Sequence, residues 1–182
     1  MAIDVDDGNT SYCSVNGILF SVDKTQLVHY PDKYPENSYC IPNSVTSIAQ
    51  GAFNDCSTLE YIIIPASVIS FAYGVFSGCS KLTTAGPIGS GCNIEYAWES
   101  TIPSKAFYDC PIVTATIGES ILRIDADAFN WCVNLTDVYY HQDENAWNQI
   151  AISSGNDYLT NAILHLGDGT LTIQIPAILF RI

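Results

Sequence analysis

A phenylalanine followed three residues later by a cysteine occurs four times in this chain, at nearly regular intervals. The pairs are Phe53 and Cys56, Phe76 and Cys79, Phe107 and Cys110, and Phe129 and Cys132. Successive pairs are separated by 23, 31 and 22 residues (53 to 76, 76 to 107 and 107 to 129). Two residue types that keep one spacing through four units indicate an internal repeat, which is typical of solenoid architectures.

Apolar residues recur at fixed places between these pairs. They are Val45, Val68 and Ile121; Ile48, Phe71, Ile102 and Ile124; Leu59, Leu82, Ile112 and Leu135; and Ile62, Ala85, Ala115 and Val138. The stretch from Leu59 to Ile64 has the L-x-x-L-x-L core of a leucine-rich repeat. One coil cannot bury its own apolar face, whereas stacked coils bury a continuous core. We therefore expect a strand-rich α/β fold, a right-handed leucine-rich-repeat solenoid with about four coils of 22–31 residues.

The stretch "IPNSVTSIAQGAFNDCSTLEYIIIP", residues 41–65, makes the resemblance more specific. It resembles the BspA-type leucine-rich repeats of bacterial surface proteins, whose units carry I-P-x-S-V-x-x-I, then A-F, then C-x-x-L. These motifs cover roughly residues 38–140, and the ending "VYYHQDENAWNQIAISSGNDYLTNAILHL" resembles the segment that often follows such repeats. One departure is Gly118, which stands where earlier units have proline. The resemblance implies an extracellular or cell-surface location and identifies no ligand.

The flanking segments have the features of caps. Residues 1–37 are expected to form an arm and a capping hairpin, with strands over Gly17–Phe20 and Gln26–Tyr30. Residues 38–140 form the predicted solenoid, with an insertion at 89–101. Residues 141–182 form the predicted C-terminal cap. It comprises a short helix over Asp143–Ile150 with Asp143 as N-cap, a hairpin of "AILHL" and "LTIQI", and an apolar tail over Pro176–Ile182.

Charge and hydropathy exclude some partners. The formal net charge is −13, with only six Lys and Arg residues, which disfavours nucleic acid and anionic lipid as partners. No run of 18 apolar residues occurs, so no membrane insertion is expected. The first residues, "MAIDVDDGNT", lack the basic and apolar regions of a signal peptide.

No group of residues predicts catalysis, a metal or a cofactor, so we do not expect an enzyme. The four repeated cysteines are read as packed thiols rather than redox or metal groups, because cysteine is commonly buried. A disulfide among Cys13, Cys40 and Cys92 stays open. The three histidines, His29, His141 and His165, lie in unrelated segments without the spacing of a zinc site.

The repeat register predicts a contact face. Residues that alternate with the buried Ile62 and Ile64 should point out of the concave sheet. They are Tyr61, Ile63, Thr84, Gly86, Thr114, Thr116, Asp137 and Tyr139, preceded by Ser38 and Cys40 on the first strand. Tyrosine suits recognition because it joins apolar area to a polar tip. The alternative is an ordinary solvated sheet face.

The insertion is a second candidate site. It carries Glu95, Tyr96, Trp98 and Glu99, and irregular loops on rigid scaffolds often carry function. The alternative is that the aromatic pair folds back to cover the solenoid.

Together these features predict a non-catalytic binding or adhesion module of a bacterial cell-surface or secreted protein. It would recognise a protein or glycan through the concave sheet and the insertion loop. The alternative function is a structural spacer that displays other domains and has no ligand of its own. The oligomeric state stays open.

Overall fold

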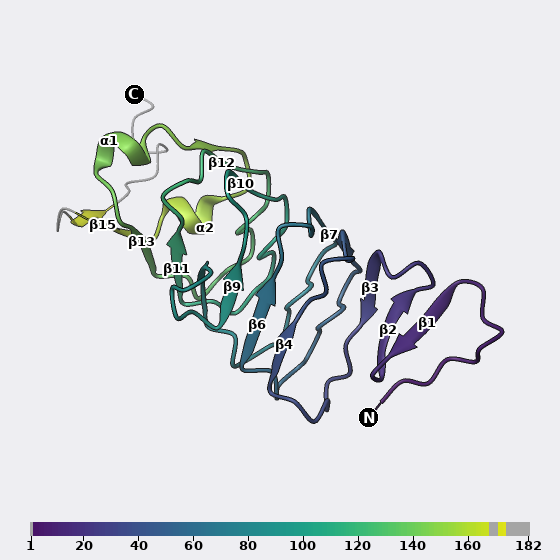
Figure 1. Ribbon diagram of the computed structural model, residues 1–182. Helices are drawn as coiled ribbons and strands as arrows, with labels where there is room; N and C mark the ends of the chain where they lie inside the picture. Colours follow the sequence, from purple (N-terminus) through teal and green to yellow (C-terminus); the bar gives the residue numbers. More distant parts are fainter. Residues whose placement is uncertain (1, 168–170, 174–182) are drawn as a thin grey trace.

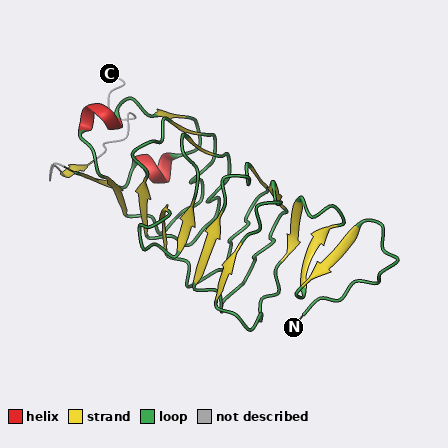
Figure 2. Cartoon of the chain, in the orientation of Figure 1, coloured by secondary structure: helices red, strands yellow, loops and turns green. Residues whose placement is uncertain are grey.

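The computed structural model describes residues 2–167 and 171–173. Within them the chain forms short strands joined by turns, with two short helices (Figure 2). The strands of the N-terminal half are β1 Tyr12–Val15, β2 Ile18–Ser21, β3 Gln26–His29, β4 Ser38–Cys40, β5 Ser47–Ile48, β6 Tyr61–Ile64, β7 Ser70–Phe71 and β8 Thr84–Pro87. The remaining elements are β9 Ile94–Tyr96, β10 Thr101–Ile102, β11 Thr114–Ile117, β12 Arg123–Ile124, β13 Asp137–Tyr140, α1 Glu144–Trp147, β14 Ala151–Ile152, α2 Asp157–Thr160, β15 Ile163–Leu166 and β16 Leu171–Ile173.

The elements form a stack of coils, with the N-terminus near one end of the stack (Figure 1). One side of the stack carries an eight-stranded sheet, called the large sheet here, in the order β16-β15-β13-β11-β8-β9-β6-β4. The opposite side carries two small sheets, in the orders β1-β2-β3-β5-β7 and β10-β12-β14. Neighbouring coils pair in parallel on both sides, as β11 with β13 and β10 with β12 show. The predicted strand-rich solenoid is confirmed.

The sequence of β6 explains why a strand forms there. Tyr61 and three isoleucines favour an extended, half-buried backbone, and Pro65 follows the strand because proline has no N–H for a ladder. Ile62 and Ile64 are fully buried, whereas Tyr61 and Ile63 are partly exposed. This alternation is the two-residue period that places one row of side chains in the core.

The repeated phenylalanines and cysteines form rows through the interior. Phe53 and Phe76 stack with their ring centroids 5.4 Å apart, and Phe107 and Phe129 lie 5.0 Å apart. All four phenylalanines and all four repeated cysteines are at most 2% exposed. The thiol of Cys79 donates to the carbonyl of Phe53 in the preceding coil. Packing is therefore the role that the structure gives these thiols.

The N-terminal segment forms a hairpin. β2 pairs antiparallel with β3, and β1, which the sequence pattern did not predict, extends the hairpin by one strand. β3 then pairs in parallel with β5, so the hairpin is attached to the repeat as its first layer. Tyr30 follows β3 and lies 5.1 Å from Phe53, in line with the phenylalanine row.

The parallel pairing continues beyond residue 140. β14 pairs with β12, and β15 pairs with β13, so these residues add a further coil. Asp143 caps α1 as predicted, because its side chain accepts a hydrogen bond from the N–H of Ala146. The predicted hairpin of β15 and β16 is also present. The predicted apolar tail over Pro176–Ile182 lies outside the described residues.

The insertion is not an external loop. Its strand β9 lies between β6 and β8 in the large sheet, although β8 precedes it in sequence. Tyr96 is 1% exposed and Trp98 is 7% exposed. This corrects the expectation of an aromatic pair on an exposed loop, and agrees with the alternative that the pair folds back onto the solenoid. The physical reason is that two large rings bury more apolar area between coils than on the surface.

Candidate functional site

The exposed face of the large sheet carries two rows of side chains in register. From β4 to β15, the first row contains Ser38, Tyr61, Thr84, Thr114, Asp137 and Ile163, and the second contains Cys40, Ile63, Glu95, Gly86, Thr116, Tyr139 and His165. Every sheet residue predicted to point outward lies in these rows. Gly86 is buried, and the other predicted ones are partly or fully exposed. Their role as contact residues stays a prediction.

Asp137, Tyr139 and His165 form a cluster at the β13–β15 end of this face. Nε2 of His165 lies 2.6 Å from Oδ1 of Asp137, and the rings of Tyr139 and His165 stack with centroids 4.4 Å apart and planes 13° apart. The hydrogen bond from His165, with a second from the Thr136 hydroxyl, lowers the pKa of the Asp137 carboxyl. Because the carboxylate only accepts, Nε2 of His165 carries the proton.

His165 lies on this face, although the sequence pattern of "AILHL" indicates only a strand of the cap hairpin. The register of the exposed rows continues one strand further than that pattern predicts. The alternation of Leu164 and Leu166 as buried positions is the signal that places His165 outward between them.

Glu95 and Tyr61 form a second pair on the same face. The Tyr61 hydroxyl donates to Oε2 of Glu95 at 2.7 Å, and the N–H of Gly91 donates to Oε1 at 2.9 Å. Glu95 is only 5% exposed. Burial by itself raises the pKa of Glu95, but the hydrogen bonds from Tyr61, Gly89 and Gly91 outweigh it and leave the pKa lowered. The same bond to Glu95 is the main reason that the pKa of Tyr61 is raised to about 12.

The connection from β8 to β9, residues 88–93, crosses the exposed face of the sheet. A Cβ atom on Gly86 would lie 2.6 Å from Oγ of Ser90 and 2.9 Å from Sγ of Cys92, so the connection lies directly on Gly86. It divides the face into two parts. The part on the β11 side holds Thr114 and Thr116 together with the Asp137–Tyr139–His165 cluster, and the part on the β4 side holds Tyr61 and Ile63.

The four insertion residues have separate environments. Tyr96 and Trp98 stack in the interior with ring centroids 5.0 Å apart, and the indole N–H of Trp98 donates to the carbonyl of Val68 at 2.9 Å. Glu95 accepts the hydrogen bond from the Tyr61 hydroxyl described above. Glu99 is the only one of the four that is exposed.

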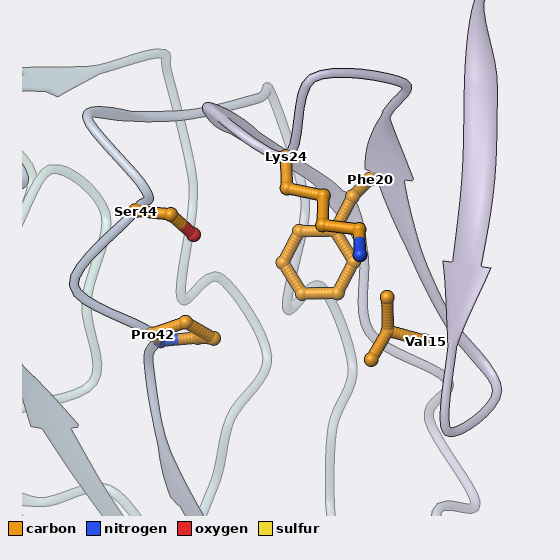
Figure 3. Close-up of a pocket in the computed structure, with 5 residues that line it drawn as sticks. All are labelled: Val15, Phe20, Lys24, Pro42 and Ser44. Carbon is orange, nitrogen blue, oxygen red and sulfur yellow. The ribbon is translucent and has the colours of Figure 1, made fainter.

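A shallow hollow lies between the N-terminal hairpin and the first coil (Figure 3). Val15, Phe20 and Pro42 give it an apolar lining, with Lys24 and Ser44 beside them and a volume of about 180 Å³. It is separate from the two rows of the large sheet, and we assign it no part in the site.

The described residues offer little to a metal or to redox chemistry. They contain no group of three or more His, Cys, Asp or Glu side chains arranged to hold a metal ion. All seven cysteines are free thiols. Burial raises the pKa of Cys132 to about 12, so its thiolate is scarce at neutral pH.

The parallel coils, buried rows and open sheet face define a leucine-rich-repeat solenoid. The sequence model of the BspA-type leucine-rich repeat region matches residues 34–96 and 99–164 with six copies, and the chain therefore belongs to this family. The matched residues include all four Phe–Cys pairs.

Two solved structures support the family assignment. The chain is 25% identical to the pneumococcal vaccine antigen PcpA, with a TM-score of 0.59, over 91% of this chain and 39% of that one. It is 26% identical to a leucine rich cell surface protein from Faecalibacterium prausnitzii A2-165, with a TM-score of 0.55, over 85% of this chain and 45% of that one. The chain thus spans less than half the length of either protein. The comparison with curated proteins gives no match.

No helix among residues 2–167 and 171–173 has the length and apolar character needed to cross a membrane.

Proposed function

We propose that this chain is a non-catalytic binding module of a cell-surface or secreted protein, and that it recognises a protein or glycan ligand through the exposed face of the large sheet. The observation that carries the proposal is the pair of side-chain rows on that face. They present hydroxyls, tyrosine and histidine in register on a rigid sheet, with few charges. Such amphipathic groups provide contact area at low entropic cost.

The part of the face on the β11 side is the better candidate for the contact. Tyr139 is 38% exposed, and its ring is held by stacking on His165, which Asp137 fixes in turn. A side chain already held in place loses little conformational entropy when a ligand binds. Tyr61 is already hydrogen-bonded to Glu95, and we place it at the edge of the contact.

The geometry supports binding rather than catalysis. An Asp–His pair resembles part of a catalytic triad, which also requires a nucleophile within hydrogen-bond reach of the histidine. Among the described residues, the only hydrogen-bond partner of the His165 ring is Asp137. The names of the two similar structures, a vaccine antigen and a cell surface protein, support an extracellular location.

The proposal can be tested with immobilised host extracellular-matrix proteins and a glycan array. We expect the chain to bind at least one of them, and the double variant Tyr139→Ala/His165→Ala to weaken that binding by about tenfold or more. Tyr12→Ala is the matched control, because Tyr12 is 45% exposed but lies in the N-terminal hairpin. Its binding should be unchanged.

Two outcomes contradict the proposal. Equal weakening by the control variant would show that the face is not the contact. No binding to any of these proteins and glycans would favour the structural spacer.

A further inference from the structure

The side of the solenoid opposite the large sheet is interrupted once. The small sheets end at β7 and begin again at β10, and no strand pairing joins these two. We call this interruption the seam. The match to the family also divides there, into residues 34–96 and 99–164.

One regular backbone contact is missing at the seam. At other junctions the N–H groups that begin a coil's short strand donate to the preceding coil. Ile69 and Ser70 donate to the carbonyl of Thr46 at 3.1 and 3.2 Å, and Leu122 and Arg123 donate to that of Ser100 at 2.9 and 3.1 Å. The equivalent donors at the seam are Ser100 and Thr101, and the equivalent acceptor is the carbonyl of Ile69. The backbone hydrogen bonds of the described residues include none between them.

A second contact is missing because of one residue. Ala72 donates to the carbonyl of Ile48 at 3.1 Å, and Asp125 donates to that of Ile102 at 3.0 Å. The equivalent residue at the seam is Pro103, which has no N–H to donate to the carbonyl of Phe71. Proline at this position therefore removes one hydrogen bond of the ladder.

Side chains hold the seam together on both flanks of this gap. Inside, Trp98 packs edge-on against Phe71 with ring centroids 5.6 Å apart. Further along the coil, Tyr73 and Tyr108 lie 4.9 Å apart, and Ser77 donates to Asp109 at 2.8 Å. Ahead of Phe71 and Ile102 the chain is more open: Ile69, Ser70 and Ser100 are exposed, and Thr101 is partly exposed.

A hollow of about 240 Å³ lies at the start of β7 and β10. It is lined from one side by Ala66 and Ile69 and from the other by Glu99, Ser100 and Thr101, with Trp98 also in its lining. Ile69 is 69% exposed, although it is a large apolar residue. The two edges that lack their mutual hydrogen bonds thus face one hollow with an apolar surface.

We propose that the seam binds an extended peptide segment of a partner protein by strand addition, parallel to β7 and β10. Its N–H groups would donate to the carbonyls of Ile69 and Phe71, and its carbonyls would accept from the N–H groups of Ser100 and Thr101. Main-chain hydrogen bonds of this kind are the usual basis of peptide recognition at a sheet edge.

The side chains around the seam indicate which residue types the bound peptide should contain. Ile69 and the edge of Trp98 suit an apolar residue, and Glu99, in a chain of net charge −13, favours a peptide with basic residues. This site lies on the opposite side of the coils from the large sheet, so it is independent of the function proposed above.

The test uses NMR on the full chain with a seven-residue peptide of alternating valine and threonine and a lysine at each end. We expect it to shift the amide signals of Ser100 and Thr101 and to slow their hydrogen exchange by about tenfold. The control peptide has the same residues with N-methylated valines, which removes backbone donors and keeps the charge. It should have no effect on these amides.

A pair of variants gives a second control. Ile69→Ser removes the apolar contact and should lower the affinity for the peptide about threefold or more. Leu122→Ser changes the residue at the equivalent place of the unit, which is 65% exposed, and should leave binding unchanged.

Four outcomes would overturn the proposal. The first is no shift of the Ser100 and Thr101 amide signals with the peptide at about 5 mM, and the second is an equal shift with the N-methylated peptide. The third is a shift of amide signals at the β4 edge instead of the seam. The fourth is slowed hydrogen exchange at Ser100 that depends only on the concentration of the chain and not on the peptide. The last would show that a second copy occupies the seam.

Discussion

At the scale of single residues, Trp98 packs in the interior beneath the seam. Its ring lies 5.0 Å from Tyr96 and 6.0 Å from Phe107, and its indole N–H bonds the carbonyl of Val68. A buried tryptophan with a satisfied N–H contributes both apolar burial and a hydrogen bond.

We therefore expect Trp98→Ala to lower the free energy of unfolding by about 3–5 kcal/mol. Trp98→Phe should cost less, since it keeps an aromatic ring and leaves only the Val68 carbonyl unpaired. Urea denaturation gives both values. Trp131 is the matched control, because it is 54% exposed. Trp131→Ala should change stability by no more than about 0.5 kcal/mol, and an equal loss in both alanine variants would contradict the packing role of Trp98.

Asp137 should contribute a pH-dependent part of the stability. Its pKa is lowered in the folded chain, chiefly by the hydrogen bond from His165 and then by that from Thr136. A carboxyl whose folded pKa lies below its unfolded value stabilises the fold above the unfolded pKa, and this stabilisation is lost as the pH falls through the folded pKa.

Asp137→Asn should therefore be less stable than the parent chain near neutral pH, and the difference should shrink as the pH falls below the ordinary value of 3.8. Thermal unfolding across this range measures the difference. A difference that stays constant with pH would show that the carboxylate charge is not responsible.

At the scale of elements, the insertion contributes a strand, β9, to the large sheet. This strand lies between β6 and β8, and the connection over residues 88–93 leads from β8 to β9 across the exposed face of the sheet. Positive φ angles at Gly89 and Gly91, +87° and +74°, allow the connection to turn sharply. The lack of a side chain at Gly86 allows it to lie on the sheet.

Gly86→Ala should displace this connection, because the new Cβ would lie within 3 Å of both Ser90 and Cys92. The thiol of Cys92 is partly buried, so its reaction with a thiol reagent should become faster. Gly118→Ala is the control. Its Cβ would have no neighbour nearer than 3.7 Å, so the rate should not change. An unchanged rate in Gly86→Ala would mean that the connection adapts without moving Cys92.

At the scale of the whole molecule, charge and repetition act together. The chain has 19 acidic and six Lys and Arg residues, so like charges repel one another across the coils. Stacked repeats contact only their neighbours, so stability is close to a sum over junctions. At the seam β6 and β9 pair in the large sheet, but β7 and β10 do not pair on the opposite side, so this junction has fewer backbone bonds there than its neighbours.

Sodium chloride should therefore raise the melting temperature between low salt and about 0.5 M, because screening weakens the repulsion. Differential scanning calorimetry measures this shift. A fall in melting temperature with salt would instead show that attractive pairs, such as Lys81 with Glu60, dominate the electrostatics.

The sequence by itself determined the repeat, and with it most of the fold and the exposed rows. Phe–Cys spacing and two-residue alternation are local patterns, and any solution that buries them must stack equivalent residues in rows. Only the tertiary structure decided where the insertion lies, which side chains of the face are held in place, and where the ladder opens. Glu95 is hydrogen-bonded to Tyr61, and Asp137 to His165, and in each case the two residues lie on strands that are distant in sequence. Such contacts depend on the order of strands in space, and the reversal of β8 and β9 shows that this order does not follow from spacing along the chain.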